Sequence, residues 1–163
     1  VDVLIRRFGL LDHLHALKSF ILLHQSDFVN SLVDALGAQL DRPARSLLRN
    51  NLVGEVDSAL RSCAAVFRNM SLNQVDTPSS LHAAETDQEE IIRRLDVRLY
   101  KANVDTTVGW DIFSLDYQLD DSPLSIIFHS KAMERYRISF WFAWQLQRVK
   151  RALSEIFMLQ TLA

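Results

Sequence analysis

Apolar residues recur at helical spacing through the first 68 residues, and this pattern predicts helices. In residues 10–23 one apolar residue follows another after three or four positions, at Leu10, Leu14, Leu17 and Ile21. His13 and His15 fall largely off that stripe. An amphipathic helix with one buried face is therefore expected over residues 10–23.

Two further helical stripes follow, separated by short polar turns. The apolar residues of the second come four apart, at Phe28, Leu32, Leu36 and Leu40. The third stripe is wider and comprises Leu48, Leu52, Val56, Ala59, Leu60, Cys63 and Phe67. Ser26 is expected to cap the second helix, and Pro43 to stand in the first turn of the third. Together these segments predict three antiparallel helices.

The pattern changes after the third helix. Residues 69–90 are polar, acidic and without periodicity, so a mobile surface insertion is expected there. Apolar and polar residues then alternate over about residues 93–100 and about 112–119. These two runs predict a small antiparallel β pair, and residues 124–128 a short third extended segment.

The chain ends in one long helical pattern that begins near Ser130 and is rich in aromatic residues. Its main apolar stripe is Met133, Tyr136, Phe140 and Trp144, widened by Trp141 and Phe142 and continued by Val149, Leu153, Ile156 and Phe157. Large aromatic side chains bury much surface, so this helix should be covered over most of its circumference. The predicted fold is mainly α, a helical bundle with a small β pair before a long C-terminal helix.

Composition agrees with one globular unit. The 163 residues are 48% apolar and 23% charged, with only four Gly and three Pro. The chain does not start with Met, and helical periodicity still runs at its end, so it is expected to be a piece of a larger protein. Cys63 is the only cysteine, which rules out an internal disulfide and favours a reduced intracellular setting. No apolar run approaches the roughly 20 residues of a membrane span, so no membrane partner is expected.

Charge is uneven along the chain although the net charge is −2. Residues 71–128 carry four basic and eleven acidic groups, whereas residues 129–163 carry six basic and two acidic groups. The basic C-terminal helix could therefore meet an acidic partner surface. A net charge of −2 does not favour nucleic-acid binding.

The sequence offers little for catalysis. Its four glycines are isolated, so no phosphate-binding loop is present. His13 and His15 are two positions apart, which on a helix points them about 200° apart and keeps them from sharing a metal ion. The paired carboxylates at 89–90 and 120–121 lie in polar segments, where general acid–base chemistry is unfavourable. Neither an enzyme, a cofactor nor a bound metal is expected.

Three stretches carry a resemblance to a known family: "LLDHLHALKSFILLHQSDFVNSLVDAL", "GWDIFSLDYQLDDSPLSIIF" and "MERYRISFWFAWQLQRVKRAL". In order and spacing they resemble the gamma-tubulin complex component family, at its second, C-terminal grip motif. The resemblance covers residues 10–68 and 91–155. The family's Gly-Gln-Gly-Asp-Phe break is here replaced by residues 24–28, "HQSDF", which removes two glycines that take positive φ easily.

The resemblance implies a non-enzymatic helical scaffold whose C-terminal half binds gamma-tubulin. Its implied partners are gamma-tubulin and other components of the complex, which templates microtubule nucleation. The implied location is cytoplasmic and cytoskeletal, at microtubule-organising centres such as spindle poles and centrosomes. The whole chain, residues 1–163, would be a fragment of the gamma-tubulin-binding C-terminal helical domain.

The resemblance also points to site residues. Gly109, Trp110, Asp111, Phe113, Leu115 and Tyr117 coincide with the family's strand motif, and Tyr136, Phe140, Trp144 and Arg148 with its helix motif. Arg148 also begins a basic turn, which we define as Arg148, Lys150 and Arg151. The candidate residues for gamma-tubulin binding are therefore Trp110, Asp111, Tyr117, Tyr136, Phe140, Trp144, Arg148, Lys150 and Arg151. Each of them either contacts the partner or shapes the surface that does. The basic turn is expected to steer an acidic partner.

A second interpretation remains open at this point. The aromatic C-terminal helix could instead belong to an interaction module that binds another partner helix in a groove. Trp110 could likewise contact a partner or simply pack the β pair onto the helices.

Overall fold

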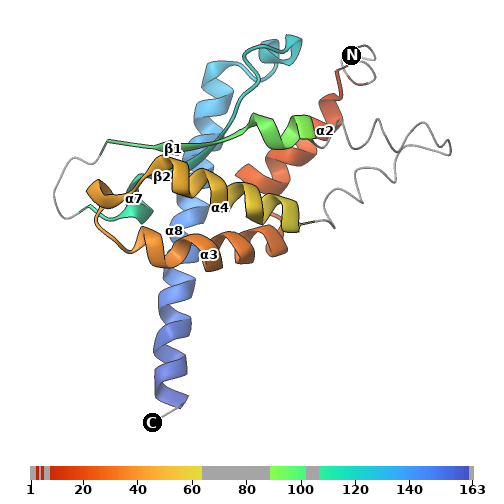
Figure 1. Ribbon diagram of the computed structural model, residues 1–163. Coiled ribbons are helices and arrows are strands. Elements are labelled where there is room, and N and C mark those ends of the chain that lie inside the picture. Colours follow the sequence, from red (N-terminus) through yellow and green to blue (C-terminus); the bar gives the residue numbers. More distant parts are fainter. Residues whose placement is uncertain (1–2, 4, 6–7, 64–88, 102–106, 162–163) are drawn as a thin grey trace.

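The computed structural model describes residues 3, 5, 8–63, 89–101 and 107–161. Its fold is mainly α, with a small antiparallel sheet before a long C-terminal helix, as predicted (Figure 1). The predicted insertion at 69–90 lies outside the described residues except for its last two, which begin a helical turn over residues 89–94.

The first helix buries Leu17 and Ile21 as predicted, but its buried face is rotated toward His13. Helix α2 (Leu10–Ala16) continues directly into a π-helical turn, η1 (Leu17–Ile21). The buried residues of the two are His13, Ala16, Leu17, Phe20 and Ile21, whereas Leu14 is 36% exposed. Leu14 was therefore wrongly placed on the buried stripe, and His13 wrongly placed off it.

The turns into the next two helices also differ from the expectations. Helix α3 (Ser26–Leu40) begins at Ser26 itself, and no side chain caps it. The turn before it still uses a positive φ, 52°, but at Leu23. Pro43 lies outside helix α4 (Arg49–Ser62); it precedes a 3₁₀ turn, η2 (Ala44–Ser46), and forms an isolated antiparallel bridge with Val108. The extended conformation of Pro43, with ψ of 136°, keeps it out of a helix.

The β pair is confirmed, with narrower bounds than predicted. Strand β1 (Leu95–Leu99) pairs antiparallel with β2 (Phe113–Tyr117), and Val97 lies opposite Leu115. All five residues of β2 are buried, and both α8 and η1 contact the strand. A short helix that was not predicted, α7 (Gly109–Ile112), leads into β2. Residues 124–128 are not extended: η3 (Pro123–Ile126) is a 3₁₀ turn, whose Leu124 amide donates to the Ser122 hydroxyl.

Helix α8 (Ser130–Thr161) crosses behind the other elements, and its C-terminal part projects beyond them (Figure 1). Its N-terminal part joins the core through Met133, Phe140 and Trp144. The expected cover over most of its circumference is absent in the described structure. Residues placed on its apolar faces remain exposed, namely Trp141, Phe142, Val149, Leu153, Ile156 and Phe157.

Candidate protein-interaction site

The short helix α7 sits against the C-terminal end of α3. A Cβ atom on Gly109 would lie only 2.8 Å from the Cα atom and 2.9 Å from the carbonyl oxygen of Leu40. No other residue fits there unless the backbone moves. The Gly109 amide also donates to the Arg42 carbonyl over 3.1 Å. The glycine of the Gly-Trp-Asp motif therefore brings two backbones into contact.

Trp110 then joins α3 to α8. Its indole Nε1 donates to Asp41 Oδ1 over 2.8 Å. Its ring stacks on Trp144 of α8, with centroids 4.8 Å apart and an interplanar angle of 29°. The Trp110 carbonyl accepts a hydrogen bond from Gln145 Nε2 over 2.8 Å. The side chain of Trp110 is fully buried, and its contacts fix the position of α8 relative to α3.

An aromatic cluster continues this packing into the sheet. The ring centroid of Phe113 lies 5.3 Å from that of Trp144 and 6.1 Å from that of Phe140. Phe140 and Trp144 are stacked, 5.9 Å apart. Trp144 Nε1 is buried and has no hydrogen-bond partner among the described residues. The contribution of Trp144 to this cluster is therefore its shape and apolar area.

Next to this cluster, two ion pairs lie at the surface. Asp111 accepts from Arg148 Nη1 over 3.0 Å and from the Val108 amide over 3.3 Å. Arg151 Nη1 donates to Asp41 Oδ2 over 3.0 Å, so Asp41 holds both Trp110 and Arg151. These pairs hold two arginines of the basic turn against the body of the protein.

Arg151 reaches Asp41 across a glycine. A Cβ atom on Gly37 would lie 2.5 Å from Arg151 Nη1, so the guanidinium rests directly on α3. Arg151 Nε also pairs with Glu155 over 3.1 Å. Lys150, between the two paired arginines, is exposed, and no described carboxylate pairs with it. The ammonium group of Lys150 is thus the most accessible charge of the basic turn.

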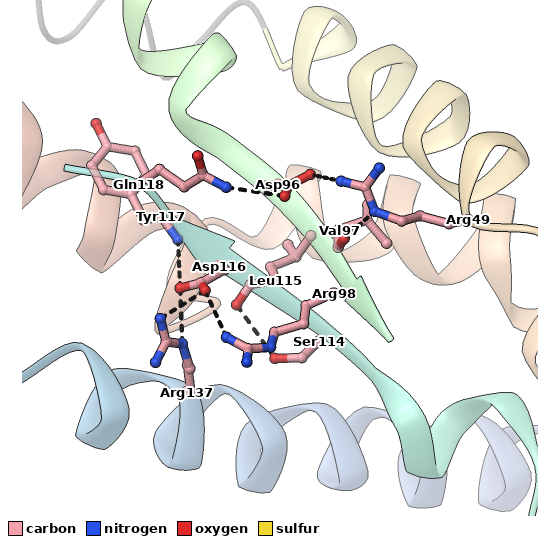
Figure 2. A network of polar contacts seen from close by, with 10 residues as sticks. All are labelled: Arg49, Asp96, Val97, Arg98, Ser114, Leu115, Asp116, Tyr117, Gln118 and Arg137. Carbon is pink, nitrogen blue, oxygen red and sulfur yellow. Dashed lines mark hydrogen bonds and ion pairs between the residues drawn. The ribbon is translucent and has the colours of Figure 1, made fainter. Parts of the chain in front are cut away.

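A second polar network fastens the sheet to α8 (Figure 2). Asp116 on β2 accepts from Arg137 Nε over 3.0 Å and Arg137 Nη2 over 2.7 Å, in a bidentate pair. Arg98 Nη1 donates to the same carboxylate over 3.3 Å. The hydrogen bond to Asp116 raises the pKa of Arg137. On the free edge of β1, Arg49 donates to the Val97 carbonyl over 2.8 Å. That bond blunts an edge otherwise open to strand pairing.

The opposite side of β2 is held by a buried hydrogen bond. His13 Nδ1 lies 2.7 Å from the Tyr117 hydroxyl, with the rings edge to face. Burial and the nearby Arg94 lower the pKa of His13, and burial raises the pKa of Tyr117. Both groups are therefore neutral near pH 7. Tyr117 therefore ties the sheet to α2.

The nine candidate residues thus fall into two groups. The side chains of Trp110, Tyr117, Phe140 and Trp144 are buried. The other five reach solvent at least in part: Asp111, Tyr136, Arg148, Lys150 and Arg151. Four of these five lie together where α8 leaves the body, and Tyr136 lies farther toward the start of the helix.

Sequence reasoning missed several residues that hold this arrangement. Asp41 and Gln145 carry no local signal, because their partners are distant in sequence. His13 did carry one. With Ala16, Leu17, Phe20 and Ile21 it follows the spacing i, i+3, i+4, i+7 and i+8, which marks a buried helical face.

Metal sites and membrane spans are absent from the described part of the chain. Residues 3, 5, 8–63, 89–101 and 107–161 contain no group of three or more His, Cys, Asp or Glu side chains arranged to hold a metal ion. None of the described helices is long and apolar enough to cross a membrane.

Comparison with known proteins gives one family. The family model described as Gamma tubulin complex component C-terminal matches residues 10–163. Gamma-tubulin complex component 3 of Homo sapiens is 37% identical over 156 residues, which make up 96% of this chain and 15% of that protein. Spindle pole body component alp6 of Schizosaccharomyces pombe is 37% identical over 147 residues, 90% of this chain and 15% of that protein.

A component 2 protein is also similar, at lower identity. Gamma-tubulin complex component 2 of Mus musculus is 27% identical over 165 residues, 96% of this chain and 18% of that protein. The chain therefore spans less than a fifth of the length of these relatives.

Proposed function

Because the chain belongs to the gamma-tubulin complex component family, we propose that it is a non-enzymatic scaffold that binds gamma-tubulin. Its further partners would be other components of the complex. Its place would be the cytoplasmic and cytoskeletal microtubule-organising centre, as the name of a spindle pole body relative suggests. In this role the protein would help template microtubule nucleation.

The observation that carries the proposal is the rigid attachment of α8. Trp110 stacks on Trp144 and bonds to Asp41, so α3, α7 and α8 are fixed relative to one another. A surface on α8 would therefore hold a bound gamma-tubulin at a defined angle. Preorganised components avoid much of the entropy cost of association, and neighbouring bound subunits gain effective concentration. Nucleation follows from that proximity, without a chemical step.

Within this proposal, Lys150 is the docking charge and the two arginines support it. Arg148 and Arg151 already pair with Asp111 and Asp41 at 3.0 Å each, so engaging a partner requires them to share or exchange carboxylates. Lys150 needs no such exchange. An acidic patch on gamma-tubulin would be steered toward this cationic end of the helix.

The test is capture of purified gamma-tubulin by the chain over a range of salt concentrations. Lys150→Glu should lower capture by about tenfold at low salt, with a smaller effect at high salt, because exposed charges are screened. The double variant Arg148→Glu with Arg151→Glu should lower capture further. Each variant needs a thermal denaturation control, since these changes place carboxylates next to Asp111 and Asp41.

Arg135→Glu is the matched control for this experiment. It makes the same charge reversal at an exposed position of the same helix, away from the Trp110 junction. Capture should be unchanged in this variant. If Lys150→Glu and the double variant both capture as much gamma-tubulin as the original chain at every salt concentration, the assigned surface is wrong.

A further inference from the structure

Helix α8 carries a second apolar face that the described structure does not cover. Its members are between 49% and 61% exposed: Phe142, Leu146, Val149, Leu153 and Ile156. Phe142 and Leu146 each stand two positions beyond a buried residue, Phe140 and Trp144. Two positions on a helix correspond to about 200°, so this face points away from the core. We call the five exposed residues the outer seam.

The spacing of the outer seam is typical of helix–helix packing. Its residues follow one another after four, three, four and three positions, which is the alternation of a and d positions in a heptad repeat. A line of apolar residues at this spacing matches the ridge of a second helix. At about 1.5 Å per residue the seam is roughly 22 Å long, enough for about two heptads of contact.

The charges beside the seam are positive. Lys150 directly follows Val149, takes a flanking position of the heptad and is exposed. The only carboxylate within the seam's span, Glu155, pairs with Arg151 on the body side. A second copy of this chain would therefore bring like charges together, while a helix with acidic flanks would be complementary.

We propose that the outer seam binds an amphipathic α-helix from outside these 163 residues, with apolar residues at heptad spacing and Asp or Glu on its flanks. In Figure 1 the C-terminal part of α8 projects beyond the other elements. The proposal goes beyond gamma-tubulin binding, because none of the five apolar residues of the outer seam is among the groups proposed to dock gamma-tubulin. Lys150, which flanks the seam, is shared by the two proposals.

Two synthetic helical peptides test the proposal. Both are about three heptads long (~21 residues) with Leu at every a and d position. One carries Glu and the other Lys at the flanking e and g positions, and like charges keep each peptide from pairing with itself. In fluorescence anisotropy with the 163-residue chain, the Glu peptide should bind at least about tenfold more tightly than the Lys peptide, about 1.4 kcal/mol.

Substitutions in the 163-residue chain test whether the Glu peptide binds at the outer seam. Leu146→Glu combined with Leu153→Glu should weaken binding of the Glu peptide by more than about tenfold, and both sites are exposed, so the fold should persist. Ile126→Glu changes an apolar residue that is 84% exposed elsewhere, and should leave binding unchanged. Lys150→Glu should reduce the preference for the Glu peptide.

Other outcomes would overturn the proposal. Equal affinity for the two peptides, or none for either, excludes an acidic-flanked helix. Self-association that the seam variant abolishes would assign the face to a second copy, and binding to phosphatidylserine vesicles in preference to the Glu peptide would assign it to lipid. The seam variant should still capture gamma-tubulin, which separates this proposal from the preceding one.

Discussion

The two halves of α8 are both rich in large apolar residues, but they have different surroundings. In residues 130–147 one face is packed against the sheet and α7 through Met133, Phe140 and Trp144. In residues 148–160 no large apolar side chain is buried. That half reaches the body through polar groups, at Arg148–Asp111 and Arg151–Asp41.

This contrast shows what a helical pattern can and cannot reveal. Periodicity identifies faces that are able to pack, but it does not say whether another element stands opposite them. The first half is buried because α7 and β2 present Trp110 and Phe113 to it. In the second half, Leu153 and Ile156 are equally apolar but remain about half exposed.

The largest expected difference between the halves is the cost of removing a large side chain. Trp144→Ala should lower the free energy of unfolding by about 3–5 kcal/mol, because it leaves a cavity beside Trp110, Phe113 and Phe140. Leu153→Ala, in the projecting half, should change it by less than about 0.5 kcal/mol. Urea denaturation monitored by circular dichroism measures both.

Trp144→Phe refines this result. It keeps a ring in the cluster and removes an indole N–H that has no partner among the described residues, so it should cost clearly less than Trp144→Ala. Equal losses for Trp144→Ala and Leu153→Ala would contradict the view that only the first half is packed.

Removing one partner of an ion pair should also cost more stability in the first half of α8 than in the second, by a smaller margin than removing a large side chain. Asp116→Ala leaves Arg137 without its bidentate partner in a largely buried setting, and should cost about 2–4 kcal/mol. Glu155→Ala removes an exposed partner of Arg151 in the projecting half, and should cost about 0.3–0.5 kcal/mol. The same denaturation assay applies, and a cost of Glu155→Ala as large as that of Asp116→Ala would count against the comparison.

The sequence allowed the elements to be predicted better than their contacts. The β pair and the long last helix were predictable because alternation and helical spacing are local properties. The first helix was misjudged because Leu14 looked more suitable for the core than His13. Burial of His13 depends on the Tyr117 hydroxyl, 104 residues away, which satisfies its ring nitrogen.

The candidate surface was predictable in part and for a similar reason. Asp111 and Arg148 were both singled out, but their pairing depends on how α7 meets α8. Trp110 was ambiguous because its fate rests on Asp41, 69 residues earlier, and on the close approach of Gly109 to Leu40. These contacts are set by the tertiary fold and leave no local trace.

The smallest expected change in stability is at the boundary between the two halves of α8, where the Arg151 guanidinium rests on Gly37. In Gly37→Ala the added methyl would displace a flexible guanidinium, which weakens its pair with Asp41 by at most about 1 kcal/mol. The change also gains about 0.5–1 kcal/mol of helix propensity in α3. The two terms nearly cancel, so the free energy of unfolding should change little, while amides near residue 151 exchange faster with deuterium.

Gly54→Ala is the matched control, because nothing lies within 4 Å of its Cβ position. It should stabilise the protein and leave exchange in α8 unchanged. If Gly37→Ala leaves exchange near residue 151 unchanged as well, the Arg151–Asp41 pair does not hold the projecting half, and the boundary lies nearer to Gln145, whose amide holds the Trp110 carbonyl.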